Sequence, residues 1–411
     1  MKIAIATLGC KTNQYESELI KESFEERRCE FVDYKESADL YIVNSCVVTG
    51  KAEAETRKLV SDALRNNPEA KVILTGCFVP LHGDFNKKNV LLYSGERRNI
   101  ANFFYERINT EPAIDDEKIK EFSEHTRAVV KIEEGCNNFC TYCVVPFTRG
   151  YYIRSKGIDR VVEEVSSLVS AGYKEIVLTG TEIGKYGEDK GTNIATLLSN
   201  LKKIEGLKRL RISSIHPKHV TDELIGEISY PIVPHLHISL QSGDNEVLKR
   251  MNRGYTIEHY LDIVKKLRNV DKNFSISTDL IVGFPGETED AFLNTMSVVS
   301  FVQLSKVHIF RFSRRPFTPA FYMEETVSEQ LKKLRSSHLK ELANSVQKSY
   351  KERFIGKAVE VLVEDTDGGL LSGFTPYYLR VKFNGKSHQR EFAQVRIERV
   401  DEGFMYGTEV Y

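Results

Sequence analysis

The sequence has no tryptophan, few cysteines and no net charge. Lysine plus arginine total 58 and aspartate plus glutamate also total 58, which excludes a protein that holds nucleic acid by overall positive charge. The charge balance does not exclude a protein that binds nucleic acid through a local basic patch. Seven cysteines in 411 residues are too few for a disulfide scaffold, and an odd number cannot all pair. We therefore expect reduced cysteines that bind a partner.

Long apolar runs are also missing. No stretch approaches the roughly 18 apolar residues of a membrane span, and the sequence shows no cleavable targeting segment. We expect a cytoplasmic protein without a membrane anchor. Hydrophobic residues make up 41% and charged residues 28%, which is ordinary globular composition, and the length allows roughly two to four domains.

The fold expected over residues 1–105 is an α/β domain with a doubly wound parallel sheet. Short β-branched runs alternate there with amphipathic stretches, giving strands at 3–6, 40–43 and 72–74 and helices at 16–28 and 53–65. Residues 106–127 are polar and charge-rich, which is typical of a linker.

Residues 128–353 repeat the strand and helix alternation six times, which predicts a partial (β/α)6 barrel. The expected strands are 129–132, 176–179, 210–213, 236–240, 276–282 and 307–312, and a long helix follows at 327–353. Residues 354–411 hold short strand runs with the turn signals Asp367-Gly368-Gly369 and Asn384-Gly385, which predicts a small all-β barrel.

The strongest chemical motif is the C-x3-C-x2-C run of Cys136, Cys140 and Cys143, directly after a predicted strand. Three thiolates on one tight loop can hold an iron–sulfur cluster and leave one iron open for a substrate such as S-adenosylmethionine. A structural zinc site is the alternative, but the spacing differs from zinc ribbons and no histidine lies nearby to complete four ligands.

A second set of cysteines is spread along the N-terminal region. Cys10, Cys46 and Cys77 each follow the carboxyl end of a predicted parallel strand, and such ends converge on one crevice. Small neighbours leave room for a second three-thiolate cluster, while three buried core cysteines are the alternative. Cys29 has no partner spacing and is read as structural or incidental.

These features resemble the radical S-adenosylmethionine methylthiotransferase family, which has an N-terminal methylthiotransferase domain, a radical domain and a C-terminal TRAM domain. The segment Leu8-Gly9-Cys10-Lys11-Thr12-Asn13 is most similar to the branch that modifies N6-threonylcarbamoyladenosine in tRNA. The isopentenyladenosine branch typically reads Gly-Cys-Gln-Met-Asn there, and the branch that acts on a ribosomal protein reads Gly-Cys-Pro-Lys-Asn.

The resemblance implies a role for each cysteine set. Cys136, Cys140 and Cys143 would hold the [4Fe-4S] cluster that cleaves S-adenosylmethionine to a 5′-deoxyadenosyl radical. Cys10, Cys46 and Cys77 would hold an auxiliary [4Fe-4S] cluster that carries the sulfur, and a second S-adenosylmethionine would give the methyl group. The expected partners are the tRNA anticodon stem-loop, an electron donor such as flavodoxin or ferredoxin, and a sulfur donor.

Further candidates for cofactor contact lie at the ends of predicted barrel strands or beside the cysteine loop, and a plain turn or a solvated side chain is the alternative for several of them. They are Tyr142, Thr181, Glu182, Ser239, Gln241, Arg253 and Asp279.

The main RNA-binding candidate is residues 306–322, which hold four basic residues, no acidic ones and interleaved aromatics. An ordinary strand with a basic loop is the alternative. The C-terminal residues 351–411 carry 9 basic and 10 acidic residues, so any RNA contact there must come from one face. The candidates are Arg311, Arg314, Arg315, Phe317, Tyr377 and Arg380.

Two departures from the family pattern concern RNA contact. The family usually reads Arg-Pro-Gly-Thr-Pro-Ala, where this chain has Phe317 in place of glycine, and Pro376 stands where the TRAM turn usually has asparagine. Two other functions stay open: the same chemistry on isopentenyladenosine tRNA or a ribosomal protein, and a non-catalytic iron–sulfur or RNA-binding scaffold.

Overall fold

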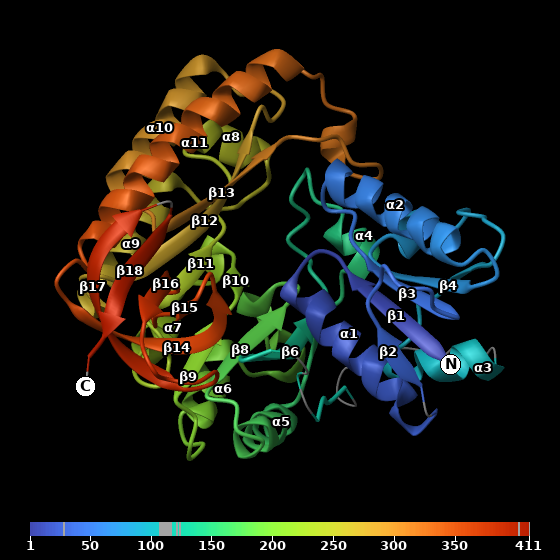
Figure 1. Ribbon diagram of the computed structural model, residues 1–411. Helices are drawn as coiled ribbons and strands as arrows, with labels where there is room; N and C mark the ends of the chain where they lie inside the picture. The colour runs from blue at the N-terminus through green and yellow to red at the C-terminus, as the bar shows by residue number, and fades with distance from the viewer. Residues whose placement is uncertain (28, 107–116, 121, 123–124, 402, 411) are drawn as a thin grey trace.

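The computed structural model describes residues 1–27, 29–106, 117–120, 122, 125–401 and 403–410 (Figure 1). Its N-terminal sheet is parallel throughout, in the order β2-β1-β3-β4-β5. The predicted strands are the three central ones, β1 (Lys2–Thr7), β3 (Leu40–Ser45) and β4 (Lys71–Gly76). The prediction missed the edge strands β2 (Glu30–Val32) and β5 (Val90–Leu92), which have three residues each and none fully buried.

Helices cover both faces of this sheet. Helix α1 (Lys11–Phe24) and helix α3 (Ile100–Glu106) pack on one face, and α2 (Gly50–Asn66) packs on the other. Helix α1 begins directly after Cys10, five residues earlier than predicted. Its Tyr15 and Leu19 belong to the core of the central domain. Figure 1 accordingly shows α1 between the N-terminal sheet and strands β6 and β8.

The central domain is built from two four-stranded sheets, β7-β6-β8-β9 and β10-β11-β12-β13. Strands β9 and β10 are separated only by Ser213, so they act as one bent strand that joins the sheets. The six strand positions of a partial barrel are therefore confirmed. The strands are β6 (Ala128–Glu134), the short antiparallel β7 (Arg154–Ser155), β8 (Glu175–Gly180), β9 (Arg209–Ile212), β10 (Ser214–Ile215), β11 (His235–Ile238), β12 (Ser275–Val282) and β13 (Lys306–Arg311).

Amphipathic helices follow these strands and bury their apolar faces against them, the last one, α11, leading to the C-terminal domain. They are α5 (Ile158–Ser170), α6 (Ile194–Leu201), α7 (Asp222–Glu227), α8 (Asn245–Arg250), α9 (Ile257–Val270), α10 (Glu289–Val302) and α11 (Glu329–Glu352). A short helix, α4 (Val145–Arg149), follows the cysteine loop.

The C-terminal strands form a closed barrel in the order β14-β15-β16-β18-β17, which confirms the expected all-β domain. The strands are β14 (Ala358–Asp367), β15 (Leu370–Phe374), β16 (Arg380–Asn384), β17 (Phe392–Asp401) and β18 (Phe404–Glu409). Gly368 and Gly369 make the β14–β15 turn with φ of +61° and +81°. The Asn384-Gly385 turn does not close a hairpin, because β16 pairs with β15 and β18 instead of β17.

Buried arginines of β9 attach this barrel to the central domain. Arg209 donates to the Glu360 carboxylate at 2.8 Å and to the Phe374 carbonyl at 2.9 Å. Arg211 pairs with Glu175 at 2.9 Å and donates to the Pro376 carbonyl at 3.2 Å. The position of the C-terminal barrel is thus set by directional, desolvated contacts.

Much of the expected linker, residues 106–127, lies outside the described residues. In its described part, Ile119 and Phe122 are buried in the central core. The domain boundaries at residues 105, 128 and 354 stay predictions. Across the described ranges, no helix combines the length and apolar character needed to cross a membrane.

Candidate active site

The loop that carries Cys136, Cys140 and Cys143 follows β6 and is fixed at both ends. Gly135 has a φ of +106°, and a Cβ there would lie 2.1 Å from the Tyr152 carbonyl oxygen, so only glycine fits. The Cys136 amide donates to the Gly150 carbonyl at 3.0 Å. Cys136 and Cys140 are buried and Cys143 is half-buried. The three thiols are therefore held together in a largely dry loop.

This environment suits thiolates only with a cationic partner. Burial raises the pKa of the Cys143 thiol to about 12, and the neighbouring Cys140 adds to the shift. Arg253 supplies one cation, because its Nη1 donates to the Cys140 Sγ at 3.2 Å. Among the described residues, no three His, Cys, Asp or Glu side chains converge as ligands of a single metal ion. Three sulfur donors on one loop, with a guanidinium at Cys140, are the donor set of a cluster held by thiolates.

The ends of β8 and β11 meet at this loop. Glu182, two residues after β8, accepts from the Asn138 amide at 2.9 Å, and burial raises the pKa of its carboxyl to about 7. Thr181 lies half-buried beside it. The Arg253 Nη2 also donates to the Ser239 carbonyl at 2.6 Å and hydroxyl at 3.0 Å. Arg253 thus joins the cysteine loop to the end of β11.

The remaining predicted cofactor residues lie farther along the same rim. Gln241 has a φ of +73°, and its backbone pairs with Asp279 at 2.8 Å. The Asp279 Oδ2 lies 3.2 Å from the His237 Nε2. Tyr142 lies in the cysteine loop with its ring edge-on to Phe284, at a centroid separation of 6.4 Å. Their contact with S-adenosylmethionine stays a prediction.

The second cysteine set lies at the carboxyl ends of three adjacent strands. Cys10 caps the start of α1 after β1, while Cys46 and Cys77 directly follow β3 and β4. A Cβ on Gly9 would come within 3.0 Å of the Cys46 Sγ, so the small residue makes room there. Burial raises the pKa of the Cys46 thiol to about 11, and nearby Cys77 and Cys10 add to it. The three thiols therefore lie at neighbouring strand ends and influence one another electrostatically, while their joint binding of a cluster stays a prediction.

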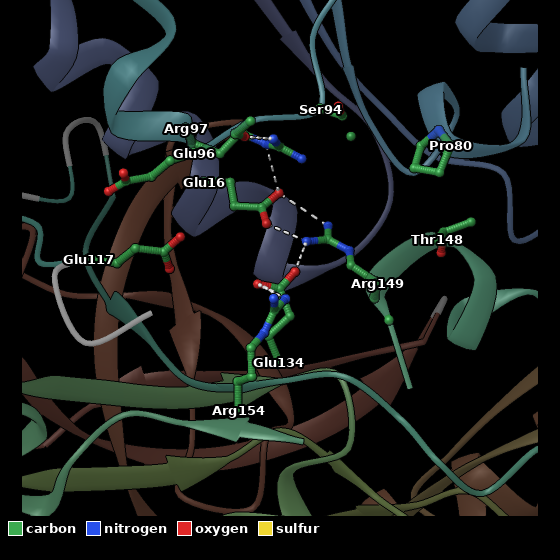
Figure 2. Close-up of a pocket in the computed structure, with 13 residues that line it drawn as sticks. Glu16, Pro80, Ser94, Glu96, Arg97, Glu117, Glu134, Thr148, Arg149 and Arg154 are labelled. Atoms are coloured by element: carbon green, nitrogen blue, oxygen red, sulfur yellow. Dashed lines mark hydrogen bonds and ion pairs between the residues drawn. The ribbon is translucent and has the colours of Figure 1, made fainter. Parts of the chain in front are cut away.

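Arg149, at the end of α4, was missed in the sequence and lies at the junction of the two domains (Figure 2). Its Nε donates to the Cys77 Sγ at 3.2 Å, and its Nη2 donates to the Asn13 Oδ1 at 2.5 Å. The same guanidinium pairs with Glu16 and, at 3.0 Å, with Glu134. These partners come from distant segments, so no local pattern marks Arg149.

A small cavity of about 230 Å³ surrounds this network. Figure 2 shows Glu16 between Arg97 and Arg149, with Glu134 below them. Lys131 lies fully buried nearby, 2.5 Å from Glu117. Buried charges are thus paired with opposite charges around this cavity, as buried charges require.

The RNA-binding candidates do not form one surface. Arg315 is buried, and its Nη1 donates to Glu53 of α2 at 2.9 Å. Arg311 and Arg314 are exposed and make looser pairs with Glu329 and Glu325, both at 3.7 Å. Arg315 therefore joins two domains, while the other two arginines face solvent.

The remaining RNA-binding candidates also differ in exposure and in their contacts within the protein. Phe317 is 58% exposed and has a φ of +68°. The Tyr377 hydroxyl donates to Asp271 at 2.9 Å, so this side chain holds the C-terminal barrel on the central domain. Arg380 is half-buried and donates to the Ser372 hydroxyl at 3.3 Å.

Comparison with known proteins first defines the class. The model of the Radical SAM superfamily matches residues 130–299, and that of Uncharacterized protein family UPF0004 matches residues 2–91. A solved structure of the radical S-adenosylmethionine methyltransferase TsrM from Kitasatospora setae has the same fold, with a TM-score of 0.57 and 16% identity over 78% of this chain and 76% of that one. Fold and cysteine loop together define a radical S-adenosylmethionine enzyme.

Curated relatives narrow the class further. The chain is 42% identical to the threonylcarbamoyladenosine tRNA methylthiotransferase MtaB of Thermotoga maritima over 97% of this chain and 95% of the relative. It is 36% identical to the tRNA-2-methylthio-N(6)-dimethylallyladenosine synthase of Clostridium novyi over 93% of this chain and 90% of that relative. The chain belongs to the radical S-adenosylmethionine methylthiotransferase family. It is therefore a transferase that uses S-adenosylmethionine and [4Fe-4S] clusters, as the sequence predicted.

Proposed function

We propose that this enzyme converts N6-threonylcarbamoyladenosine beside the tRNA anticodon to its 2-methylthio derivative, in the cytoplasm. The segment 8–13 and the identity to the Thermotoga maritima relative support this substrate. The C2–H bond of adenine is neither acidic nor electrophilic, so cofactors must supply the difficult chemistry while the protein positions and shields the base.

The observation that carries the proposal is the short helix α4. It begins two residues after Cys143, and its last residue, Arg149, contacts Cys77. A helix of five residues advances about 7.5 Å along its axis. The two cysteine sets are therefore joined across one domain junction by α4 and the Arg149 side chain, as expected if both act on one base.

The cysteine sets would hold two different groups. A [4Fe-4S] cluster at Cys136, Cys140 and Cys143 would supply the electron that cleaves S-adenosylmethionine, and a cluster on the second set would supply sulfur for a methyl group from another S-adenosylmethionine. Arg253 would hold the Cys140 thiolate by a charge-assisted bond. The donors of electrons and sulfur are proposed partners.

Side chains around the first set would bind the methionine part of S-adenosylmethionine. Glu182 lies at the end of β8 beside the cysteine loop, where a carboxylate can accept from an ammonium group. Ser239 offers a hydroxyl that Arg253 already orients. For RNA contact we retain Arg311, Arg314, Phe317 and Arg380, because Arg315 and Tyr377 are engaged within the protein.

Anaerobic reconstitution tests the cofactor assignment. The wild type should bind about eight irons per chain, since two clusters of four irons are expected. A Cys136→Ala, Cys140→Ala, Cys143→Ala triple variant should keep about half of this iron and form no 5′-deoxyadenosine. Cys29→Ala is the matched control and should behave as the wild type. Formation of 5′-deoxyadenosine by the triple variant would show that the radical site is elsewhere. Absence of iron from the reconstituted wild type would favour the alternative of a non-catalytic RNA-binding scaffold.

Nucleoside analysis of tRNA from a deletion strain tests the substrate. We expect loss of 2-methylthio-N6-threonylcarbamoyladenosine and retention of the isopentenyl product. The reverse pattern would assign the enzyme to the isopentenyladenosine branch. Intact tRNA nucleosides would point to a protein substrate.

A further inference from the structure

A cavity of about 700 Å³ lies beside Cys10, where the three domains meet. Its walls include Cys10, Lys11 and Gln14 from the N-terminal domain, Arg127 from the approach to β6, and Tyr378 and Gln389 from the C-terminal barrel. The volume lies within the range of small-ligand pockets. Since Cys10 belongs to the second cysteine set, a group that enters this cavity lies next to that set.

Lys11 places an amino group with no hydrogen bond from the described residues in this cavity, and burial, with Arg127 and Arg211 nearby, lowers its pKa. Within the described residues, its Nζ makes no hydrogen bond or ion pair, and its nearest partner is the Tyr378 ring at 5.4 Å. Arg127, by contrast, is paired with Glu364 at 2.5 Å and with Glu175 at 3.8 Å. An anion that enters the cavity would therefore find Lys11 ready to bind.

The surroundings of Tyr378 show which charges line the cavity beside Cys10. Tyr378 has a φ of +60°, and its ring also lies 5.3 Å from the Arg127 guanidinium and 4.5 Å from that of Arg211. Burial alone would raise the pKa of its hydroxyl, but Lys11, Arg127 and Arg211 outweigh burial and lower it. Three cationic side chains, Lys11, Arg127 and Arg211, thus surround the Tyr378 ring, and the carboxylates of Glu364 and Asp365 line the cavity as well.

We propose that this cavity receives the N6 substituent of the target adenosine and that Lys11 pairs with the carboxylate of that substituent. The inference rests on the proposed function and names the residue that selects the substrate. Positions C2 and C6 of adenine flank the same ring nitrogen, so the substituent on N6 lies within one ring width of C2. A residue that reads the substituent must therefore lie beside the second cysteine set, as Lys11 does.

The chemistry of the cavity separates the two known tRNA substrates. A threonylcarbamoyl group carries a carboxylate, a hydroxyl and amide groups, and the Gln14 and Gln389 side chains can meet the neutral polar atoms. A dimethylallyl group is apolar and would leave the Lys11 ammonium desolvated without a partner. An enzyme rejects an analogue most strongly when the analogue leaves a buried polar group of the site without a hydrogen-bond partner.

Binding of synthetic anticodon stem-loops to the reconstituted enzyme tests this proposal. Fluorescence anisotropy would compare RNA carrying N6-threonylcarbamoyladenosine, unmodified adenosine, or the methyl ester of the threonyl carboxylate. The wild type should prefer the free acid to both other RNAs by roughly 10- to 100-fold, the range for a charge-assisted hydrogen bond. Lys11→Gln should lose most of this preference, and Lys11→Arg should keep it.

Lys35→Gln, on an exposed turn of the same domain, is the matched control and should retain the full preference. Iron content of each variant would show whether the neighbouring cysteines still bind. Full preference in Lys11→Gln, or equal binding of acid and ester by the wild type, overturns the role of Lys11 and leaves the proposed function standing. Equal binding of acid and unmodified RNA by the wild type, with no product formed, overturns the proposed substrate itself.

Discussion

Phe317 has a left-handed backbone conformation that glycine adopts without strain, and glycine is the residue its family usually has there. Its exposed ring lies 6.2 Å from that of Phe147, at a pocket that Cys140 and Cys143 also line. A strained aromatic beside a functional site indicates that the ring is retained for contact rather than for stability.

Two substitutions of Phe317 distinguish the effect of backbone strain on stability from the effect of the ring on RNA binding. Phe317→Gly and Phe317→Ala both remove the ring, but only glycine relieves the positive φ. We expect the glycine variant to be more stable than the alanine variant by about 1 kcal/mol in urea unfolding. Both variants should lose the same part of the RNA affinity. Equal stability of the two would show that the backbone relaxes in alanine.

At the residue level, the sequence predicted where a residue lies when that position follows from a strand. Cys10, Cys46 and Cys77 were placed together because each follows a parallel strand. It failed where partners come from several distant segments, as with Arg149. The basic residue Arg315, a candidate for RNA contact, pairs with Glu53 in this structure, a partner that composition does not show, and its contact with RNA stays a prediction.

Among the elements, strands β8 and β9 carry an unusual buried charge cluster. Glu175 is fully buried and pairs with Arg211 at 2.9 Å and Arg209 at 3.6 Å. Burial opposes ionisation, but these arginines and Arg127 lower the pKa of the carboxyl to about 2. Because the pKa is lower in the folded state, the pair stabilises fully above the ordinary carboxyl pKa and loses this effect as pH falls toward 2.

Glu175→Gln tests this linkage. At neutral pH the variant should be destabilised by about 3–5 kcal/mol, because Arg211 is left buried without its counter-ion. The gap between variant and wild type should narrow as pH falls from about 5 toward 3. Urea unfolding of the iron-free proteins at several pH values measures this difference in unfolding free energy. Glu205→Gln, at an exposed position, is the control. A gap that stays constant with pH would contradict the assignment.

Elements with long apolar patterns were predicted well, because burial of one face leaves a clear period in the sequence. The six barrel positions and the C-terminal barrel follow from such runs. Strands β2 and β5 carry no such signal, since neither has a fully buried residue. The early start of α1 was missed because its first turn, from Lys11, serves the domain junction and is polar.

For the whole molecule, zero net charge limits how RNA can be bound. Three of the predicted RNA-binding residues, Arg311, Arg314 and Arg380, are exposed or half-buried and can contact phosphate. About three contacts give a slope near −2 for log affinity against log salt on single-stranded RNA. Titrations between about 50 and 200 mM salt would measure this slope.

Paired variants sharpen that prediction. Arg311→Gln with Arg314→Gln should weaken binding and flatten the slope by about 1.4, since each contact contributes about 0.7. Arg315→Gln should leave the slope unchanged and lower the unfolding midpoint, because Arg315 holds α2. A flattened slope in Arg315→Gln would show that this arginine reaches RNA after all.

The attachment of the C-terminal barrel through Arg209 and Arg211 also decides which partner must change shape. The walls of the cavity beside Cys10 are already assembled from three domains by internal contacts. A preformed pocket at the base of such a junction admits the N6 substituent of a nucleobase only when that base has rotated out of its stack. We therefore expect the distortion on binding to fall on the anticodon loop, and adenosines in flexible, unstacked loops to be the ones the enzyme reaches.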